Sequence, residues 1–283
     1  MRRNSVALGQ TWLSTQIISR NTIFGALVSV AFLNYVFAAA GQSISRDGLW
    51  LAVSSTFGIS ALIWIAMLYV VSLMLETTDH TQIDRRDIAV FTVAIMLILV
   101  PHKYVPVLAQ SGIAVYLYVR ADTSKNLRKA AILLGAATVP MLWGNLLMLF
   151  FNEFILSADA FLVALISSGE RVGNVVINAE TDWYIKISRG CSSLSNLSIG
   201  ILSWTFFILF YDRKYGAYKF IWLAVILIPI VVINVIRMAM IVTDFDFYDI
   251  LHEGAGSDVA NFITLAVIVG ISYIGIRRPN DQV

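Results

Sequence analysis

Residues 220–243 have the sequence FIWLAVILIPIVVINVIRMAMIVT, in which Asn234 and Arg237 interrupt an otherwise almost entirely apolar stretch. A helix that crosses a bilayer needs about 20 predominantly apolar residues, so this stretch predicts a transmembrane helix. A charged side chain at membrane depth costs several kcal/mol and is found mainly where it has a partner or a function. We therefore expect Arg237 to have one or the other.

The rest of the chain repeats this apolar pattern. Hydrophobic residues make up 58% of the sequence and charged residues 13%, unlike the composition of soluble proteins. We therefore predict an all-α polytopic membrane protein of about eight transmembrane helices, with residues 1–283 forming a single integral membrane domain. The stretches free of acidic and basic residues that predict these helices are 21–45, 48–75, 88–102, 104–119, 130–152, 190–211, 220–236 (continuing to 243) and 259–276.

The basic residues predict how these helices are oriented. If the N-terminus is cytoplasmic, fourteen of the twenty Lys and Arg residues lie at the cytoplasmic side and five lie in the outer loops. This is the bias that cytoplasmic loops show in membrane proteins, and it predicts that both termini are cytoplasmic. Because the basic residues mark topology, the net charge of +2 does not indicate a nucleic-acid partner.

Residues 153–190 differ from the predicted spans and are expected to form an extracytoplasmic insertion. Residues 154–168 are apolar on one side but include Asp159, and they predict an interfacial helix on the outer face. Residues 172–179 and 183–189 are rich in β-branched residues around a turn-like segment, which predicts a small β-hairpin before the sixth span.

Cys191, the only cysteine of the chain, follows this insertion. A single cysteine cannot form an intramolecular disulfide. We expect it in the first turn of the sixth span, where the helix N-terminus and the nearby Arg189 favour the thiolate, the nucleophilic form. The alternative is that Cys191 is a small buried side chain with no chemical role.

Two further residues are expected near Cys191 at the outer face. Arg237 lies in the outer half of its span, with Asn234 on the same helical face, and a guanidinium suits the stabilisation of an oxyanion. His252 follows in an acidic loop and is a candidate general acid and base. The alternatives are an arginine that extends to the membrane surface and an incidental loop histidine. The other histidines lack companions typical of metal ligands, so we predict no metal site.

Three motifs in this order resemble the exosortase/archaeosortase family of membrane-embedded cysteine transpeptidases. They are Arg-Gly-Cys-Ser-Ser-Leu at 189–194, Asn-Val-Ile-Arg at 234–237 and His-Glu-Gly-Ala-Gly at 252–256. The resemblance extends over the organisation of nearly the whole chain, while its specific content is confined to the motif segments. Ser193 departs from the family pattern, which usually has glycine at this position.

The resemblance implies a protein-sorting enzyme in the inner membrane of a prokaryote, with its active site on the extracytoplasmic side. Its partners would be membrane-anchored precursor proteins that end in a short motif, a transmembrane helix and a basic cluster. The enzyme would cleave near the motif through a cysteine thioester and pass the new C-terminus to an amine acceptor, without a cofactor. The motif match assigns Cys191 as nucleophile, Arg237 as transition-state stabiliser, His252 as general acid and base, and Asn234 as a supporting residue.

Two other classes of protein fit the composition. In a transporter or a polysaccharide-assembly subunit, Arg237 would bind an anionic substrate and Cys191 would be incidental. In a non-catalytic membrane scaffold, the spans would pair with the helix of a precursor protein. The sequence has no matching pair of broken helices in its two halves, a pattern that marks many transport sites.

Overall fold

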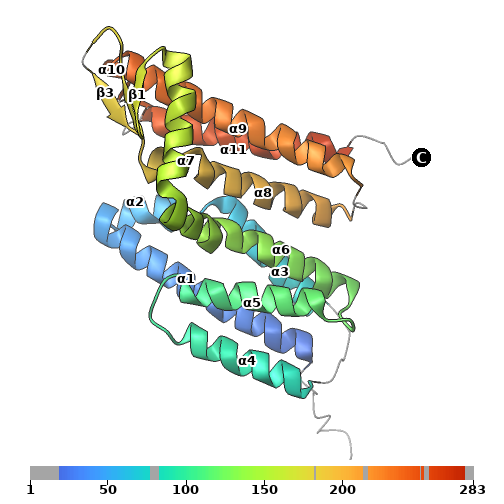
Figure 1. Cartoon of the computed structure of the whole chain (residues 1–283). Coiled ribbons are helices and arrows are strands. Elements are labelled where there is room, and N and C mark those ends of the chain that lie inside the picture. The colour runs from blue at the N-terminus through green and yellow to red at the C-terminus, as the bar shows by residue number, and fades with distance from the viewer. Residues whose placement is uncertain are drawn as a thin grey trace, which may run out of the picture.

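The computed structural model describes residues 19–76, 83–181, 183–212, 216–248, 250–251 and 255–277. Helices dominate this part of the chain, and a small β-sheet lies at one end of the helix bundle (Figure 1). The N-terminal half consists of α1 (Arg20–Asp47), α2 (Leu49–Ser54), the short η1 (Thr56–Gly58), α3 (Ala61–Leu75), α4 (Arg85–Ile98), α5 (Val105–Val119) and α6 (Lys125–Thr138).

The C-terminal half carries three long helices and the sheet. Its elements are the π-helical turn η2 (Val139–Trp143), α7 (Gly144–Ser167), β1 (Glu170–Val172), β2 (Val175–Ile177), β3 (Tyr184–Lys186), the 3₁₀ turn η3 (Arg189–Cys191), α8 (Ser193–Phe210), α9 (Tyr218–Thr243), α10 (Asp246–Tyr248) and α11 (Ala255–Arg277).

Five helical segments in the described part of the chain are long and apolar enough to cross a membrane: Arg20–Asp47, Lys125–Ser167, Ser193–Phe210, Lys219–Thr243 and Val259–Arg277. The helices α3 and α5 are apolar but shorter. Each of the eight predicted stretches contains a helix, so the prediction of an all-α membrane protein is confirmed at this level. The count of eight spans and the cytoplasmic termini stay predictions.

Local sequence signals explain where several helices begin and bend. The hydroxyl of Ser19 caps α1, and Asp84 caps α4 in a capping box with Asp87. Pro140 has no backbone N–H, so the regular hydrogen-bond ladder cannot continue through it. The chain there forms the π-helical turn η2, which joins α6 and α7 into one bent helix of 43 residues.

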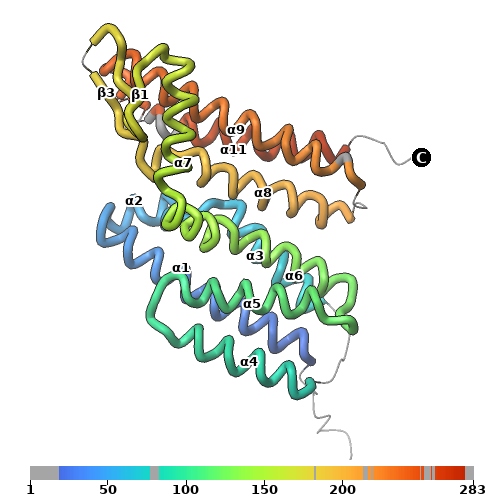
Figure 2. Tube along the Cα trace, viewed as in Figure 1, coloured from blue at the N-terminus to red at the C-terminus, as the bar shows by residue number. Residues whose placement is uncertain are grey.

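The helices form two groups that share α8 as their link. In one group α8, α9 and α11 contact one another, and in the other α1, α4, α5, α6 and α3 pack together. Figure 2 shows the two groups side by side, with α7 running across them toward the sheet. The helix α8 contacts both α3 and α6, so the residues at its N-terminus lie where the two groups meet.

The region before Cys191 begins with a helical segment that follows a kink. We expected a separate interfacial helix over 154–168, and α7 is kinked at Phe151, where the backbone angles are non-helical, so the residues from 152 to 167 form a helical segment of their own. Its place at a membrane surface stays a prediction. The polar Asp159 of this segment is buried against the start of α8.

The predicted hairpin is present and has a third strand. The strands β2 and β3 pair antiparallel around the segment that follows Ile177, as expected, and β1 pairs with the other edge of β2. A two-residue turn joins β1 to β2, and its Gly173 has a φ of +61°, a conformation that glycine adopts without strain. The sheet packs on α7 and on the end of α9, and it leads the chain to Cys191.

Candidate functional site

Cys191 is the last residue of the 3₁₀ turn η3, immediately before Ser192, the N-cap of α8. We expected it inside the first turn of the helix. The side chain of Ser192 accepts a hydrogen bond from the backbone N–H of Leu194, and this cap starts the helix at Ser193, two residues after Cys191. Cys191 therefore lies just before the N-terminus of α8, where Ser192 and Asp159 accept hydrogen bonds from the first N–H groups of the helix.

The backbone around Cys191 is held by side chains from two other helices. Asn234, on α9, donates from its amide nitrogen to the carbonyl oxygen of Cys191 at 2.8 Å and to Oγ of Ser193 at 3.1 Å. Asp159, on α7, accepts from the hydroxyl of Ser192 at 2.7 Å and from the backbone N–H of Ser193 at 3.2 Å. Both Asn234 and Asp159 are at least 93% buried, so the Cys-Ser-Ser segment is fixed from both sides.

Ser193, where the resemblance would place glycine, takes part in this arrangement. Its backbone is helical, with a negative φ, so a serine is accommodated without backbone strain. Its hydroxyl and its N–H are the groups that bond Asn234 and Asp159. A glycine here would lack the hydroxyl contact.

The thiol of Cys191 borders a cavity of about 350 Å³. The side chain is only 5% exposed and packs within an apolar cluster formed by α7, the sheet and α9. Its sulfur lies 3.4 Å from the hydroxyl oxygen of Ser188. The cavity is mainly apolar and aromatic, and its lining residues are Trp183, Tyr184, Ile185, Lys186, Cys191, Met238, Ile241 and Tyr248.

Arg237 lies on α9 between Asn234 and the cavity-lining Met238. Its Nε is buried, and its guanidinium makes no hydrogen bond or salt bridge to any residue that the structure describes. Arg237 and Cys191 nevertheless lie close enough for a charge on one side chain to act on the other. A half-buried guanidinium with unused donors is free to hold a negatively charged oxygen.

The structure thus brings together three of the four predicted site residues: Cys191, Asn234 and Arg237. His252 lies outside the described residues, so its prediction is not tested. Within the described ranges, no group of three or more His, Cys, Asp or Glu side chains is arranged to hold a metal ion. The chemistry that these groups support is nucleophilic attack by sulfur with electrostatic stabilisation by arginine.

Two contributors to the site were missed by sequence reasoning. Asp159 is the only acidic residue in residues 154–168, and a charge in such an apolar stretch is a recognisable sign of a function or a partner. We interpreted it as evidence for a membrane surface. Ser188 carries no comparable signal, because nothing in its sequence surroundings indicates that its hydroxyl lies beside a sulfur.

Comparison with known proteins gives no match for this chain among protein-family models, curated proteins or solved structures.

Proposed function

We propose that this protein is a protein-sorting cysteine peptidase or transpeptidase that acts on membrane-anchored precursors at the outer face of the membrane. The observation that carries the proposal is the relation between Arg237 and Cys191. The only cysteine of the chain borders a cavity, and the half-buried guanidinium near it has no partner among the described residues. Such an arrangement leaves the arginine's donors available for a charge that forms during the reaction.

The chemistry of the first half-reaction follows from the residue types. The Cys191 thiol gives its proton to a base, for which the motif assigns His252, and the thiolate attacks the carbonyl carbon of the scissile peptide. Arg237 stabilises the oxyanion. When the oxyanion collapses, the carbon–nitrogen bond breaks and the leaving amine takes the proton from His252. The product is a thioester on Cys191.

The second half-reaction releases the enzyme. An amine of the acceptor attacks the thioester carbonyl, loses its proton to the same base and displaces the thiolate. Water in place of the amine gives hydrolysis. No cofactor takes part in either half-reaction.

The cavity beside Cys191 supports a further detail of this proposal. Its walls include the aromatic Trp183 and the apolar Met238 and Ile241, so it suits an apolar or aromatic side chain of the precursor next to the scissile bond. Lys186 borders the same cavity, and its ammonium group would suit a polar neighbour of that side chain.

The proposal is tested by co-expressing the protein with a precursor from the same genome that ends in a short motif, an apolar helix and a basic tail. We expect wild-type protein to cleave the precursor and the Cys191→Ala and Cys191→Ser proteins to leave it intact while still inserting into the membrane. Thr205→Ala serves as control, since its hydroxyl bonds only the preceding turn of α8. Cleavage at the wild-type rate by Cys191→Ala would overturn the proposal.

The role of Arg237 needs a separate variant. Arg237→Lys keeps the positive charge but loses the planar array of donors, and Arg237→Gln loses the charge. We expect cleavage to fall by about 10²–10³-fold in Arg237→Gln, the usual effect of removing an oxyanion donor, and by less in Arg237→Lys. Equal cleavage rates of the wild type, Arg237→Lys and Arg237→Gln would show that Arg237 does not stabilise the transition state.

Transport is the alternative that one observation favours, because a second, polar cavity lies between the two helix groups. A thiol-alkylating reagent distinguishes the two functions. Alkylation of Cys191 should abolish precursor cleavage, whereas a transporter whose pathway runs through the other cavity should tolerate it.

A further inference from the structure

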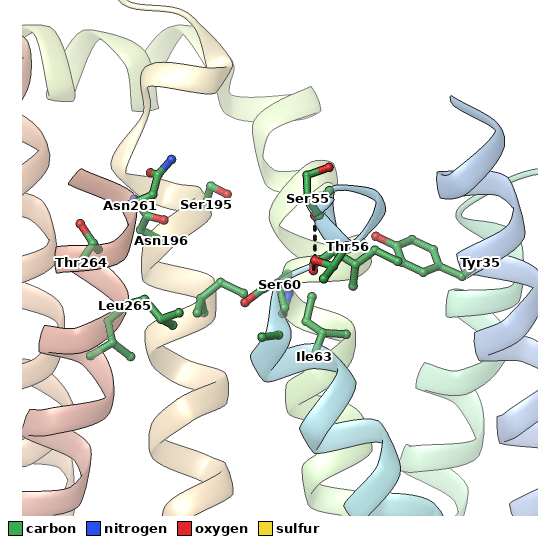
Figure 3. Close-up of a pocket in the computed structure, with 16 residues that line it drawn as sticks. Tyr35, Ser55, Thr56, Ser60, Ile63, Ser195, Asn196, Asn261, Thr264 and Leu265 are labelled. Atoms are coloured by element: carbon green, nitrogen blue, oxygen red, sulfur yellow. Dashed lines mark hydrogen bonds between the residues drawn. The ribbon is translucent and has the colours of Figure 1, made fainter. Parts of the chain in front are cut away.

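A polar cavity of about 470 Å³ lies between α3, α8 and α11, apart from the cavity that borders Cys191. Figure 3 shows Ser195, Asn196 and Asn261 on one side of it and Tyr35 and Thr56 on the other, with Ser60 between them. The segment after α2 and the first turns of α8 contribute to its lining. The cavity therefore lies toward the end of the bundle that carries the sheet (Figure 1).

The lining of this cavity is polar but uncharged. None of the residues around it is Asp, Glu, Lys, Arg or His. Phosphates are usually bound by arginine or lysine, and ammonium groups by carboxylates or aromatic cages. Hydroxyl and carboxamide groups with an aromatic residue nearby are instead suited to a ligand that has many neutral hydroxyl groups.

Several polar groups of the lining are left for a ligand. The carboxamides of Asn196 and Asn261 and the hydroxyl of Ser60 make no hydrogen bond to the part of the chain that the structure describes. Each carboxamide offers two donors and an acceptor. Polar side chains at membrane depth generally face a protein interior or a water-filled cavity and mark functional sites.

The size of the cavity narrows the choice of occupant. Small-molecule sites have volumes of about 300–1,000 Å³, and this cavity falls in that range. The helix of a precursor protein would need a groove about 30 Å long to lie across the bilayer. A headgroup of one or two sugar units fits the cavity, whereas a transmembrane helix does not.

The wall nearest α3 has an unusual backbone. Thr56 and Phe57 have φ of +52° and +57°, and Gly58 has a φ of +70°. Non-glycine residues rarely adopt this region, and residues held there concentrate at ligand-binding and active sites. Thr56 donates its hydroxyl to the carbonyl oxygen of Ile59, which holds this wall in place.

The cavity is also close to the proposed nucleophile. Ser195 and Asn196 follow Cys191 by four and five residues, and Ser195 lies only two residues into α8. At about 1.5 Å of rise per residue, the lining on α8 begins within about one turn of the helix N-terminus. Cys191 precedes the same end of α8, so the cavity and the cysteine share this helix N-terminus.

We propose that this cavity binds an uncharged, hydroxyl-rich part of the acceptor, a glycan or glycolipid whose amine lies outside the cavity and resolves the thioester. This inference rests on the function proposed above. The amine nitrogen forms a bond to the thioester carbonyl carbon, the carbon–sulfur bond breaks, and the proton of the amine passes to the base that served the first half-reaction.

Binding is tested on the Cys191→Ala protein, which needs no catalysis. Native mass spectrometry would compare retention of a neutral monoglucosyl diacylglycerol, of phosphatidylglycerol and of the soluble sugar methyl glucoside. We expect the neutral glycolipid to be retained in preference to phosphatidylglycerol. Methyl glucoside that binds as well as the glycolipid identifies a free glycan as the source, and weaker binding identifies a lipid-linked one.

Substitutions in the lining then test whether the glycolipid binds in this cavity. Asn196→Leu with Asn261→Leu should weaken glycolipid binding about tenfold or more, since two hydrogen-bonding side chains are lost. Asn145→Leu removes a carboxamide that lies outside the lining and serves as control. The single variant Asn261→Leu, at an exposed position, should weaken binding in the same direction and guards against misfolding of the double variant.

Two results would overturn the inference: preferential retention of phosphatidylglycerol, and sugar binding that the double variant leaves unchanged. Absence of binding by both the glycolipid and methyl glucoside would overturn it as well. Failure of the proposed function is seen separately, because it would appear as a loss of precursor cleavage by wild-type protein while glycolipid binding to Cys191→Ala persists.

Discussion

At the scale of single residues, the backbone around Cys191 is held by side chains from two other helices. Its carbonyl oxygen is bound by Asn234, and the two serines that follow it are bound by Asp159. The sulfur itself has a hydroxyl neighbour in Ser188 and a cavity beside it. A nucleophile held in this way keeps its position when substrate enters. Less entropy is then lost in reaching the transition state.

Asn234 offers a test of this arrangement with a matched control. Asn234→Leu removes a hydrogen bond of 2.8 Å to a carbonyl oxygen, and Asn34→Leu removes a similar bond of 2.7 Å, to Ile98, in the other helix group. We expect each variant to lower the free energy of unfolding by about 1–3 kcal/mol, measured by denaturation in detergent. Only Asn234→Leu should also slow precursor cleavage. If both variants cleaved equally well, Asn234 would be structural alone.

At the scale of elements, close contact between helices depends on small residues. Gly275, on α11, faces the rings of Trp222 and Trp204, where an added Cβ would come within 2.9 Å and 3.0 Å of ring carbons. Rigid rings cannot move aside as the end of an aliphatic side chain does. The contact of α11 with α8 and α9 therefore requires glycine at this position.

A pair of substitutions on the same helix tests this packing. Gly275→Ala should lower the free energy of unfolding by about 1–3 kcal/mol, as overpacking does. Gly270→Ala meets nothing within 4 Å and should be neutral or stabilising by up to about 1 kcal/mol, because alanine favours the helix. Thermal denaturation of the two proteins provides the comparison. The same effect from both substitutions would contradict the packing around Gly275.

A second element-scale feature is the ion-pair cluster around Arg120, which joins the ends of α1, α4 and α5. Arg120 bonds Asp122, Asp84 and Asp87, and Arg20 also bonds Asp122. Hydrogen bonding to Arg120 lowers the pKa of Asp122 to about 2 and holds the pKa of Asp84 well below its ordinary value.

This cluster predicts a pH dependence of stability. A carboxyl whose pKa is lower in the folded than in the unfolded state stabilises the protein above the unfolded value, about 3.9, and loses this effect as the pH falls through the folded value. The melting temperature should therefore fall between about pH 4 and pH 2, and less steeply in Asp122→Asn than in the wild type. Identical slopes for the two proteins would exclude a contribution from Asp122.

At the scale of the whole molecule, the sequence predicted the helices better than their junctions. Apolar stretches such as 21–45 and 259–276 correspond to α1 and α11, because length and hydrophobicity alone mark such helices. The sequence also predicted the candidate site residues Cys191, Asn234 and Arg237, because a lone cysteine and polar or charged side chains are conspicuous in an apolar chain. The burial of Asp159 was not predicted, because it depends on a tertiary contact with Ser192 that local sequence does not encode.

The orientation of the whole molecule remains a prediction that labelling can test. In a Cys191→Ser background, a single cysteine in place of Trp50, which is 83% exposed, should react with a membrane-impermeant maleimide on intact cells. A single cysteine in place of Arg85, at the start of α4, should react only after the membrane is permeabilised. The reverse pattern would invert the topology and remove Cys191 from the outer face.

The central claim, that Cys191 is a nucleophile that forms a thioester with a precursor protein, has one direct measurement. Intact-protein mass spectrometry of wild-type protein isolated with its precursor should detect an adduct equal in mass to the N-terminal fragment of the precursor. The adduct should map to Cys191, disappear with hydroxylamine and be absent from the Cys191→Ala protein. Turnover of the precursor by wild-type protein with an adduct on another residue, or the same turnover by Cys191→Ala, would contradict the account.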